Sequence, residues 1–174
     1  MSNPEKGDFF DRVVSANRVA LLSYFQRRLD NPADAAEAFG ELLLTAWRSQ
    51  RRMPADEIAA RMWLYGVARN VLRNTRRALA RRSAAVQQFK EQLAAAPAPA
   101  TDPLHEDMRD AIAALQVEDA ELVRLIYWDG LASHEAAQVL GINPSTARSR
   151  LTKARAAIRA TIESNAESVG QRDA

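Results

Sequence analysis

A proline- and alanine-rich segment in the second half of the chain constrains the fold more than any other feature. Residues 94–103 read AAAPAPATDP, a composition in which prolines interrupt helices and no side chain is large enough to pack. The 174-residue chain is therefore predicted to form two units, each small enough to be marginally stable alone. We place the first unit at 8–82, a linker at 83–103 and the second unit at 104–163, and we expect a disordered tail over 164–174.

Both units are predicted to be helical, so the fold class is all-α. The chain has only six glycines and is rich in Ala, Leu, Arg and Glu, whereas clusters of β-branched residues are scarce. Asn31 is expected to cap a helix that begins at Pro32, and Gly130 is expected to end a helix in the left-handed conformation. The other helices are predicted over about 8–29, 57–82, from 104 onward, 118–128, 133–140 and 143–162.

Apolar residues at helical spacing predict the buried faces. On the second helix this face carries Phe39, Leu43, Ala46 and Trp47, and Trp47 is expected in the core. Trp63 and Tyr65, on the third helix, are also expected to pack in the core rather than to stack on bases. The first helix is expected to bury Phe10, Val14, Leu21, Leu22, Phe25 and Leu29. The fourth helix is expected to bury Leu104, Met108, Ile112 and Leu115.

The composition excludes several classes of function. The chain has no cysteine, which excludes disulfides, thiolate zinc sites and thiol nucleophiles, and His105 and His134 are too few for the usual metal sites. No run of about 18 apolar residues is present, so membrane insertion is not expected, and the N-terminus lacks a secretory signal. We therefore expect a cytoplasmic protein without a cofactor, a metal or catalytic residues.

Basic residues are concentrated in two segments, although the net charge is only +2 and the pI about 9.3. In the first segment Asn70, Arg73, Asn74, Arg77 and Arg81 share one stripe of a helix, and Arg69 precedes it. In the second, no acid occurs between Glu135 and Glu163, whereas five basic residues do: Arg148, Arg150, Lys153, Arg155 and Arg159. The segregation indicates two surfaces that face a polyanion, with solvated basic helix faces as the alternative.

Acidic residues form a row on the second helix. Asp34, Glu37 and Glu41 follow at positions i, i+3 and i+7, which places their carboxylates on one side of the helix, opposite the predicted apolar side. This row is interpreted either as a solvated acidic face or as a docking surface for a basic partner.

A short helix, a turn at Gly141 and a longer helix with Pro144 in its first turn predict a helix-turn-helix over 133–162. The second helix of that motif enters the major groove of DNA with its N-terminal residues, where Arg can bond guanine and Ser or Thr can reach bases or phosphates. A plain helical hairpin with a basic rim is the alternative. The residues expected at DNA are Ser145, Thr146, Arg148, Ser149, Thr152 and Lys153.

Three segments together resemble the extracytoplasmic-function (ECF) family of RNA polymerase sigma factors. Residues 129–155 are similar to sigma region 4, with the sequence DGLASHEAAQVLGINPSTARSRLTKAR. Residues 31–48 are similar to region 2.2, with the sequence NPADAAEAFGELLLTAWR, and residues 63–70 to the start of region 2.4, with the sequence WLYGVARN. The resemblance extends over nearly the whole chain, in the order and spacing of the family.

The resemblance implies a dissociable subunit of bacterial RNA polymerase that recognises the −35 and −10 promoter elements and helps to melt the latter. It implies that Asp34, Glu37 and Glu41 bind the basic coiled coil of the β′ clamp, and that Asn70 helps to capture an unstacked base of the −10 element. Region 4 would read the −35 element and rest on the β flap, and an anti-sigma protein would hold the factor inactive. The −10 contacts implied are Arg69, Asn70, Arg73, Asn74 and Arg77, with Arg76, Arg77, Arg81 and Arg82 on phosphates.

The sequence departs from the family pattern in several places. Gly40 stands where Gln is common, which puts one polymerase contact in doubt. Ala60 replaces a common aromatic residue and Ala55 a frequent glycine, so the −10 pocket is expected to prefer an unusual base. Ala132 replaces the usual Ser at the start of the helix over 133–140, so Ser133 is expected to cap that helix instead.

Three other functions fit the sequence less well. A stand-alone helix-turn-helix repressor or activator needs a dimer interface, and the sequence shows no spare apolar face for one. An enzyme acting on nucleic acid needs clustered carboxylates for metal ions, whereas the acids are expected on an outer face far from the basic stripe. A purely structural helical adaptor leaves both basic segments unexplained.

Overall fold

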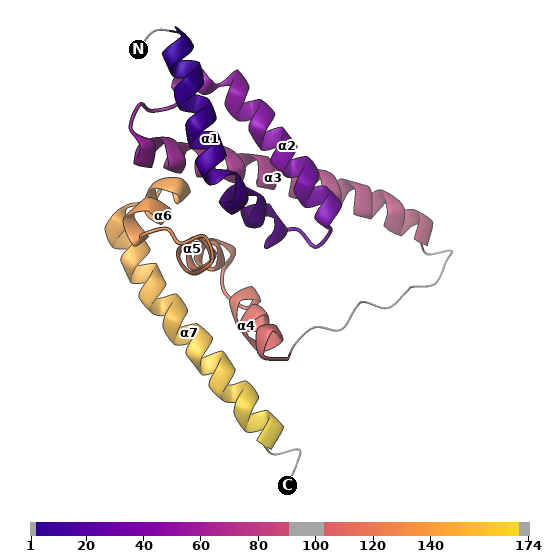
Figure 1. The fold of residues 1–174 in the computed structure, drawn as a ribbon. Coiled ribbons are helices and arrows are strands. Elements are labelled where there is room, and N and C mark those ends of the chain that lie inside the picture. Colours follow the sequence, from indigo (N-terminus) through magenta and orange to yellow (C-terminus); the bar gives the residue numbers. More distant parts are fainter. Residues whose placement is uncertain (1–2, 91–102, 171–174) are drawn as a thin grey trace. The chain divides into compact units, whose positions relative to one another are not determined.

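The computed structural model describes residues 3–90 and 103–170, with side chains over 7–82 and 108–164, and these ranges contain helices and no strand. The chain separates into two compact units, 1–95 and 96–174 (Figure 1). The predicted all-α fold with two helical units is confirmed. Unit 1 contains α1 (Asn3–Gln26), α2 (Pro32–Arg48), the short 3₁₀-helix η1 (Gln50–Arg52) and α3 (Glu57–Lys90). Unit 2 contains α4 (Pro103–Ala113), α5 (Val117–Tyr127), α6 (Ser133–Leu140) and α7 (Pro144–Gly170).

Unit 1 is a bundle in which α1, α2 and α3 each pack on the other two. Its centre is aromatic: Tyr24, Phe25 and Tyr65 are fully buried. The Tyr24 ring meets the other two edge to face, with centroids 5.3 Å from Phe25 and 5.8 Å from Tyr65, a geometry that adds to the free energy gained from burial alone. The prediction that Tyr65 belongs to the core is confirmed.

Arg28 and Arg76 make contacts that stabilise the chain at the end of α1. The Arg28 guanidinium lies over the Tyr24 ring, 3.8 Å from its centroid, and Nη1 donates to the Tyr24 carbonyl at 3.1 Å. Arg76 Nη2 on α3 donates in turn to the Arg28 carbonyl at 3.2 Å. Arg76, which the sequence assigned to a phosphate, therefore makes a contact that ties α3 to the end of α1.

The second helix begins as predicted but buries a different side. Asn31 Oδ1 accepts a hydrogen bond from the Ala33 amide at 2.8 Å, so the N-cap is confirmed. The buried residues are Ala35, Ala38, Leu42 and Ala46. Trp47 is 59% exposed, so its predicted place in the core is wrong. Alanines allow α1 and α3 to approach α2 closely, and this rotation of the helix buries Leu42 but leaves Leu44 and Trp47 exposed.

Three helices are longer than predicted. The first begins at Asn3 rather than Asp8, the third ends at Lys90 rather than Arg82, and the seventh ends at Gly170 rather than Ile162. Neither 83–90 nor 163–169 contains a proline or glycine, so nothing stops the helix where the apolar periodicity fades. Part of the predicted linker and of the predicted disordered tail is therefore helical, and their remainders, 91–102 and 171–174, lie outside the described residues.

Unit 2 packs α4, α5 and α6 on α7. Its core is aliphatic, with Ile112, Leu122 and Leu125 almost completely buried. Gly130 and Gly141 have φ of 66° and 68°, a left-handed conformation that side chains disfavour. The expected left-handed end at Gly130 is thus confirmed. On α4 the predicted apolar face is only partly buried, since Met108 is 41% exposed, and the Leu104 side chain lies outside the described residues.

Candidate functional site

Three carboxylates and two large apolar side chains are accessible on α2. Glu37 and Glu41 are exposed and Asp34 is half-buried in the first turn, where the positive end of the helix dipole stabilises a carboxylate. Leu44 and Trp47, nearer the C-terminal end of α2, are 40% and 59% exposed. We call these five residues the α2 surface. The sequence pattern placed Trp47 in the core and did not single out Leu44, although the alanines at the buried positions indicate which side of α2 faces inward.

The acids of α2 share a groove with part of the predicted DNA stripe of α3. The groove measures about 450 Å³. The helices α2 and α3 pack directly on each other. The side of α2 next to this contact therefore faces the neighbouring side of α3. The prediction that the acids lie far from the basic stripe is therefore wrong. The charged and amide side chains that line the groove are Asp34, Glu37, Glu41, Asn70, Asn74, Arg81 and Arg82.

The structure divides the residues assigned to the −10 element into two groups. Asn70 and Asn74 line the groove beside the α2 acids, whereas Arg73 and Arg77 are exposed outside it. Arg73 Nη2 lies 3.4 Å from Asn70 Oδ1, to which it donates. Arg69 is half-buried. Both amides of the stripe therefore face the groove that the acids line, as does Arg81 further along α3, whereas Arg73 and Arg77 lie outside it.

The helix-turn-helix is built from α6, the turn at Gly141 and α7. Ala136, Ala137 and Ala147 are fully buried where the two helices meet, and small side chains there allow close packing. Asn143 Oδ1 accepts from the Ser145 amide at 2.9 Å and from its hydroxyl at 2.8 Å, which satisfies a free donor at the start of α7. The six predicted DNA contacts are all exposed: Ser145, Thr146, Arg148, Ser149, Thr152 and Lys153.

The start of α6 differs from the prediction. The N-cap is Ala132, whose amide donates to Glu135 Oε2 at 2.8 Å. Ser133 Oγ is buried and has no hydrogen-bond partner in the part of the chain that the structure describes. The expected capping role of Ser133 is therefore wrong, because the Glu135 carboxylate reaches back to the first turn instead.

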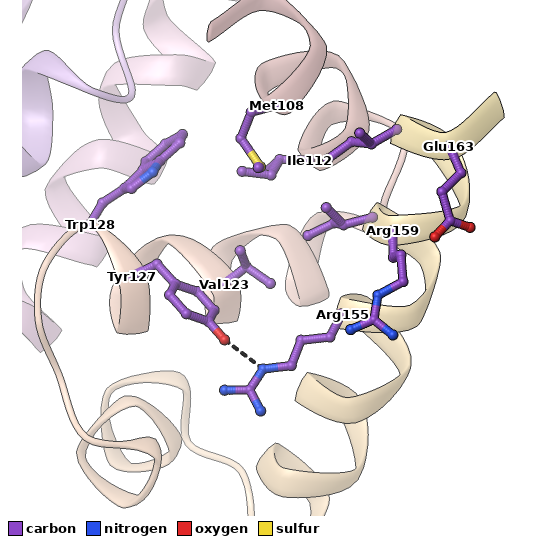
Figure 2. Close-up of a pocket in the computed structure, with 10 residues that line it drawn as sticks. Met108, Ile112, Val123, Tyr127, Trp128, Arg155, Arg159 and Glu163 are labelled. Carbon is purple, nitrogen blue, oxygen red and sulfur yellow. Dashed lines mark hydrogen bonds between the residues drawn. The ribbon is translucent and has the colours of Figure 1, made fainter. Parts of the chain in front are cut away.

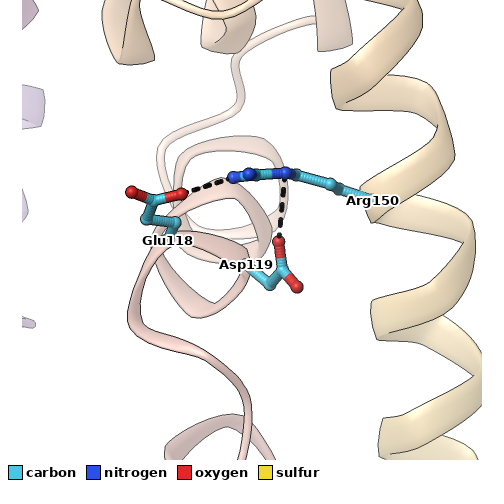
Figure 3. A network of polar contacts seen from close by, with 3 residues as sticks. All are labelled: Glu118, Asp119 and Arg150. Atoms are coloured by element: carbon cyan, nitrogen blue, oxygen red, sulfur yellow. Dashed lines mark hydrogen bonds and ion pairs between the residues drawn. The ribbon is translucent and has the colours of Figure 1, made fainter.

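Two basic residues of α7 are engaged within unit 2. Arg150 Nη1 lies 2.6 Å from Glu118 Oε2, and Arg150 Nε lies 3.8 Å from Asp119 Oδ1 (Figure 3). The hydrogen bond to Glu118 and the negative charge of both carboxylates raise the pKa of Arg150. Arg155 Nε donates to the Tyr127 hydroxyl (Figure 2). Basic residues that look equivalent in the sequence therefore differ in their surroundings.

An apolar groove of about 710 Å³ lies within unit 2. Side chains from α4, α5 and α7 point into it, and the charged groups of α7 lie along one side (Figure 2). Sequence analysis did not predict this groove. Its lining consists of Met108, Ile112, Val123, Tyr127, Trp128, Ile158, Ile162, Arg155, Arg159 and Glu163.

Membrane-spanning helices and clusters of metal-binding side chains are both absent from the described residues. Within 3–90 and 103–170, no helix has the length and apolar content that a bilayer crossing requires. Across the same part of the chain, no three His, Asp or Glu side chains lie together as ligands for a metal ion.

Comparison with known proteins identifies the family. Residues 13–82 match the family described as Sigma-70 region 2, and residues 105–158 match Sigma-70, region 4. The chain is also 30% identical, over 156 residues, to the ECF RNA polymerase sigma factor SigL of Mycobacterium tuberculosis, with 87% of each chain covered. The chain belongs to the ECF family of RNA polymerase sigma factors. It is an alternative sigma factor that directs RNA polymerase to promoters, which confirms the function implied by its three motifs.

Two solved structures resemble this sigma factor in fold. The sigma factor RpoE, in complex with the anti-sigma factor NepR from Bartonella quintana, matches with a TM-score of 0.62 and 21% identity, covering 88% of this chain and 96% of its own. CnrH, in complex with the cytosolic domain of CnrY, matches with a TM-score of 0.61 and 21% identity, covering 89% and 88%.

Proposed function

We propose that the two units of this sigma factor divide promoter recognition between them. Unit 1 docks on polymerase and takes the −10 element, and unit 2 reads the −35 element. The observation that carries this proposal is the opposite charge of the two exposed helix surfaces: carboxylates on α2, and basic and hydroxyl groups on the N-terminal half of α7.

The α2 surface is proposed to bind the basic coiled coil of the β′ clamp. Carboxylates facing a basic helix steer association and fix the register of the complex. Leu44 and Trp47 add an exposed apolar part to the same surface, and tryptophan is among the residues that contribute most to binding energy at interfaces. Trp47 is thus proposed as the anchor, with Asp34, Glu37 and Glu41 providing electrostatic complementarity.

The division of the α3 stripe suggests how it meets the −10 element. The groove that Asn70 and Asn74 line carries three carboxylates against the two guanidinium groups of Arg81 and Arg82, a net formal charge of −1 that disfavours phosphate there. The DNA backbone is therefore proposed to pass over Arg73 and Arg77, with Arg69 nearby. An uncharged, unstacked base would then turn toward the amides, whose contacts offset the few kcal/mol that unstacking costs.

On unit 2, the N-terminal half of α7 is proposed to enter the major groove of the −35 element. Arg148 and Lys153 are exposed there, and Arg is suited to bidentate contact with guanine. The remaining four residues, with shorter side chains, are proposed to reach bases or phosphates: Ser145, Thr146, Ser149 and Thr152.

The apolar groove of unit 2 is proposed to receive the β flap. Its floor is apolar and its rim is charged along α7, which is the usual composition of a protein docking site. Docking there would leave the exposed N-terminal half of α7 available for DNA, because the groove involves the later turns of that helix, from Arg155 to Glu163.

We further propose that an anti-sigma protein regulates this chain and that the protein works in the cytoplasm, where promoters and polymerase are found. RpoE and CnrH were each solved with a bound partner. No catalytic step is assigned, since sigma factors are in general non-enzymatic initiation factors.

The proposal is tested by reversing charge on the α2 surface. Glu37→Lys combined with Glu41→Lys should abolish binding to purified core polymerase, measured by fluorescence anisotropy of the labelled full chain, while the circular dichroism spectrum is unchanged because both side chains are exposed.

A matched control is Asp8→Lys with Asp11→Lys on α1, where the carboxylates are also exposed and the change in net charge is the same. This variant should bind core polymerase like the natural chain. Unchanged binding by the α2 variant, or an equal loss in both, would refute the docking assignment.

A further inference from the structure

We infer that Arg150 is a positioning residue that fixes the reading helix α7 on α5, and that Glu118 and Asp119 hold its guanidinium away from DNA. The inference rests on the proposed role of α7 at the −35 element. It assigns a specificity-determining function to two acidic residues on a helix that has no predicted DNA contact.

The geometry is that of a two-point contact between helices. Arg150 uses two different nitrogens on two consecutive carboxylates, Nη1 on Glu118 at 2.6 Å and Nε on Asp119 at 3.8 Å (Figure 3). Both acids stand in the first turn of α5. The hydrogen bond at Nη1 is directional, and the ion pair at Nε adds attraction at a second point, so together they restrain the rotation of α7 as well as its distance from α5.

The position of Arg150 on α7 makes this restraint relevant to DNA reading. Ala147, Leu151 and Ala154 form the buried side of the helix, whereas Arg148 and Lys153 are exposed. At about 100° per residue, Arg150 lies at the boundary between these two sides. A rotation of α7 that loosened this contact would therefore also move the neighbouring residues that are proposed to reach base edges.

The charge balance keeps Arg150 from serving as a phosphate contact. One guanidinium beside two carboxylates gives this place a net formal charge of −1, which repels a phosphate. Phosphate contacts supply most non-specific affinity, and each contributes about −0.9 to the slope of log K against log salt. Because Arg150 contacts Glu118 and Asp119 rather than a phosphate, the affinity of the protein for unrelated DNA is lower. The neighbouring residues of α7 keep their base contacts.

The test uses holoenzyme reconstituted from the full chain and core polymerase. One probe is the duplex promoter most enriched by the natural holoenzyme from a library with a randomised −35 element, and the other is the same duplex with that element scrambled. Dissociation constants for both probes, measured over a KCl series, give the specificity ratio and the salt slope. The variants are Arg150→Gln, Arg150→Lys, Glu118→Gln with Asp119→Asn, and the combination of Arg150→Gln with both acid substitutions.

Four results are expected. Arg150→Gln leaves the salt slope unchanged but lowers the specificity ratio by about fivefold to tenfold, as loss of one good base contact would. Arg150→Lys, which keeps the charge, restores most of the ratio. Glu118→Gln with Asp119→Asn releases Arg150, which steepens the slope by about 0.9 and strengthens binding to the scrambled probe. The combined variant returns the slope to that of the natural protein.

Two results would overturn the inference. The first is a salt slope that becomes shallower by about 0.9 in Arg150→Gln, which would make Arg150 a phosphate contact. The second is an unchanged salt slope and an unchanged affinity for the scrambled probe after Glu118→Gln with Asp119→Asn.

The substitutions Lys153→Ala and Arg148→Ala separate this inference from the proposed function. If neither of these two substitutions changes the binding of holoenzyme to either probe, the assignment of α7 to the −35 element fails. If they weaken binding while Arg150→Gln has no effect on the specificity ratio, only the present inference fails.

Discussion

Two exposed helix surfaces of this sigma factor, one in each unit, carry opposite charges and differ in how their side chains are arranged. On unit 1 the carboxylates of α2 face outward beside Leu44 and Trp47, which are also exposed. On unit 2 the basic residues of α7 are sorted: Arg150 and Arg155 contact α5, whereas Arg148 and Lys153 are exposed on the N-terminal half of the helix. A broad charged surface suits docking on a protein, and a smaller set of oriented side chains suits reading of base edges.

The cores differ in a related way. Unit 1 buries its aromatic residues Tyr24, Phe25 and Tyr65 in the centre of the bundle. Unit 2 has an aliphatic core, and its Tyr127 and Trp128 line the apolar groove instead. The difference indicates that the aromatic residues of unit 2 are available to a partner, whereas Tyr24, Phe25 and Tyr65 of unit 1 hold the fold together.

The largest effect is expected from a core truncation that tests whether the units are separate. Leu42→Ala and Leu125→Ala each remove a fully buried side chain and should cost about 2–5 kcal/mol of stability. Hydrogen exchange read by mass spectrometry should show faster exchange over α1–α3 for Leu42→Ala and over α4–α7 for Leu125→Ala. Faster exchange over the whole chain in either variant would mean that the units unfold together.

A smaller effect is expected from removal of the proposed anchor of the α2 surface. Trp47→Ala should weaken core polymerase binding by about 2 kcal/mol, roughly 30-fold, with little loss of stability because the side chain is 59% exposed. Titration of the labelled chain with core polymerase measures the change. Val19→Ala is the control, since Val19 is 70% exposed on α1 and should bind normally; equal losses in the two variants would remove Trp47 from the interface.

On unit 2 the corresponding test is Arg148→Ala. We expect a loss of −35 selectivity of about 1–3 kcal/mol, confined to one base position, because a bidentate base contact disappears. Competition between matched and single-substituted promoters for holoenzyme measures it. A uniform loss on every sequence would reassign Arg148 to a phosphate.

The smallest effect is expected at the apolar groove. Met108→Asp introduces a charge into the groove lining and should reduce binding of unit 2 to an isolated β-flap fragment about tenfold, close to 1.4 kcal/mol. Val117→Asp is the control, because Val117 is 77% exposed and is not among the groove-lining residues. If both variants bind the fragment as the natural chain does, the groove is not the flap site.

Much of the fold could be predicted because caps and turns are written in short motifs. Asn31-Pro32, Gly130 and Gly141 each determine their local backbone, and the sequence placed them correctly. Helix rotation could not be predicted for α2, because its inward side is marked by Ala35 and Ala38 rather than by its largest apolar residues. Periodicity weighted by hydrophobicity therefore selected Trp47 for the core.

The candidate sites show the same limit. Exposure of the DNA-facing residues of α7 follows from the motif, since the buried alanines and the helical repeat determine which side chains point outward. Contacts between distant segments do not follow from it. The pairing of Arg150 with Glu118 joins two helices, and the groove shared by α2 and α3 depends on how those helices pack; local sequence patterns encode neither.

The most direct test of the central claim compares the full chain alone with the chain bound to core polymerase, each titrated with the same promoter duplex. The division of roles between the units predicts tight, sequence-specific binding only for the holoenzyme, because polymerase holds the −10 and −35 contacts at the distance that the promoter requires. Tight and specific binding by the chain alone, unaffected by core polymerase, would contradict it.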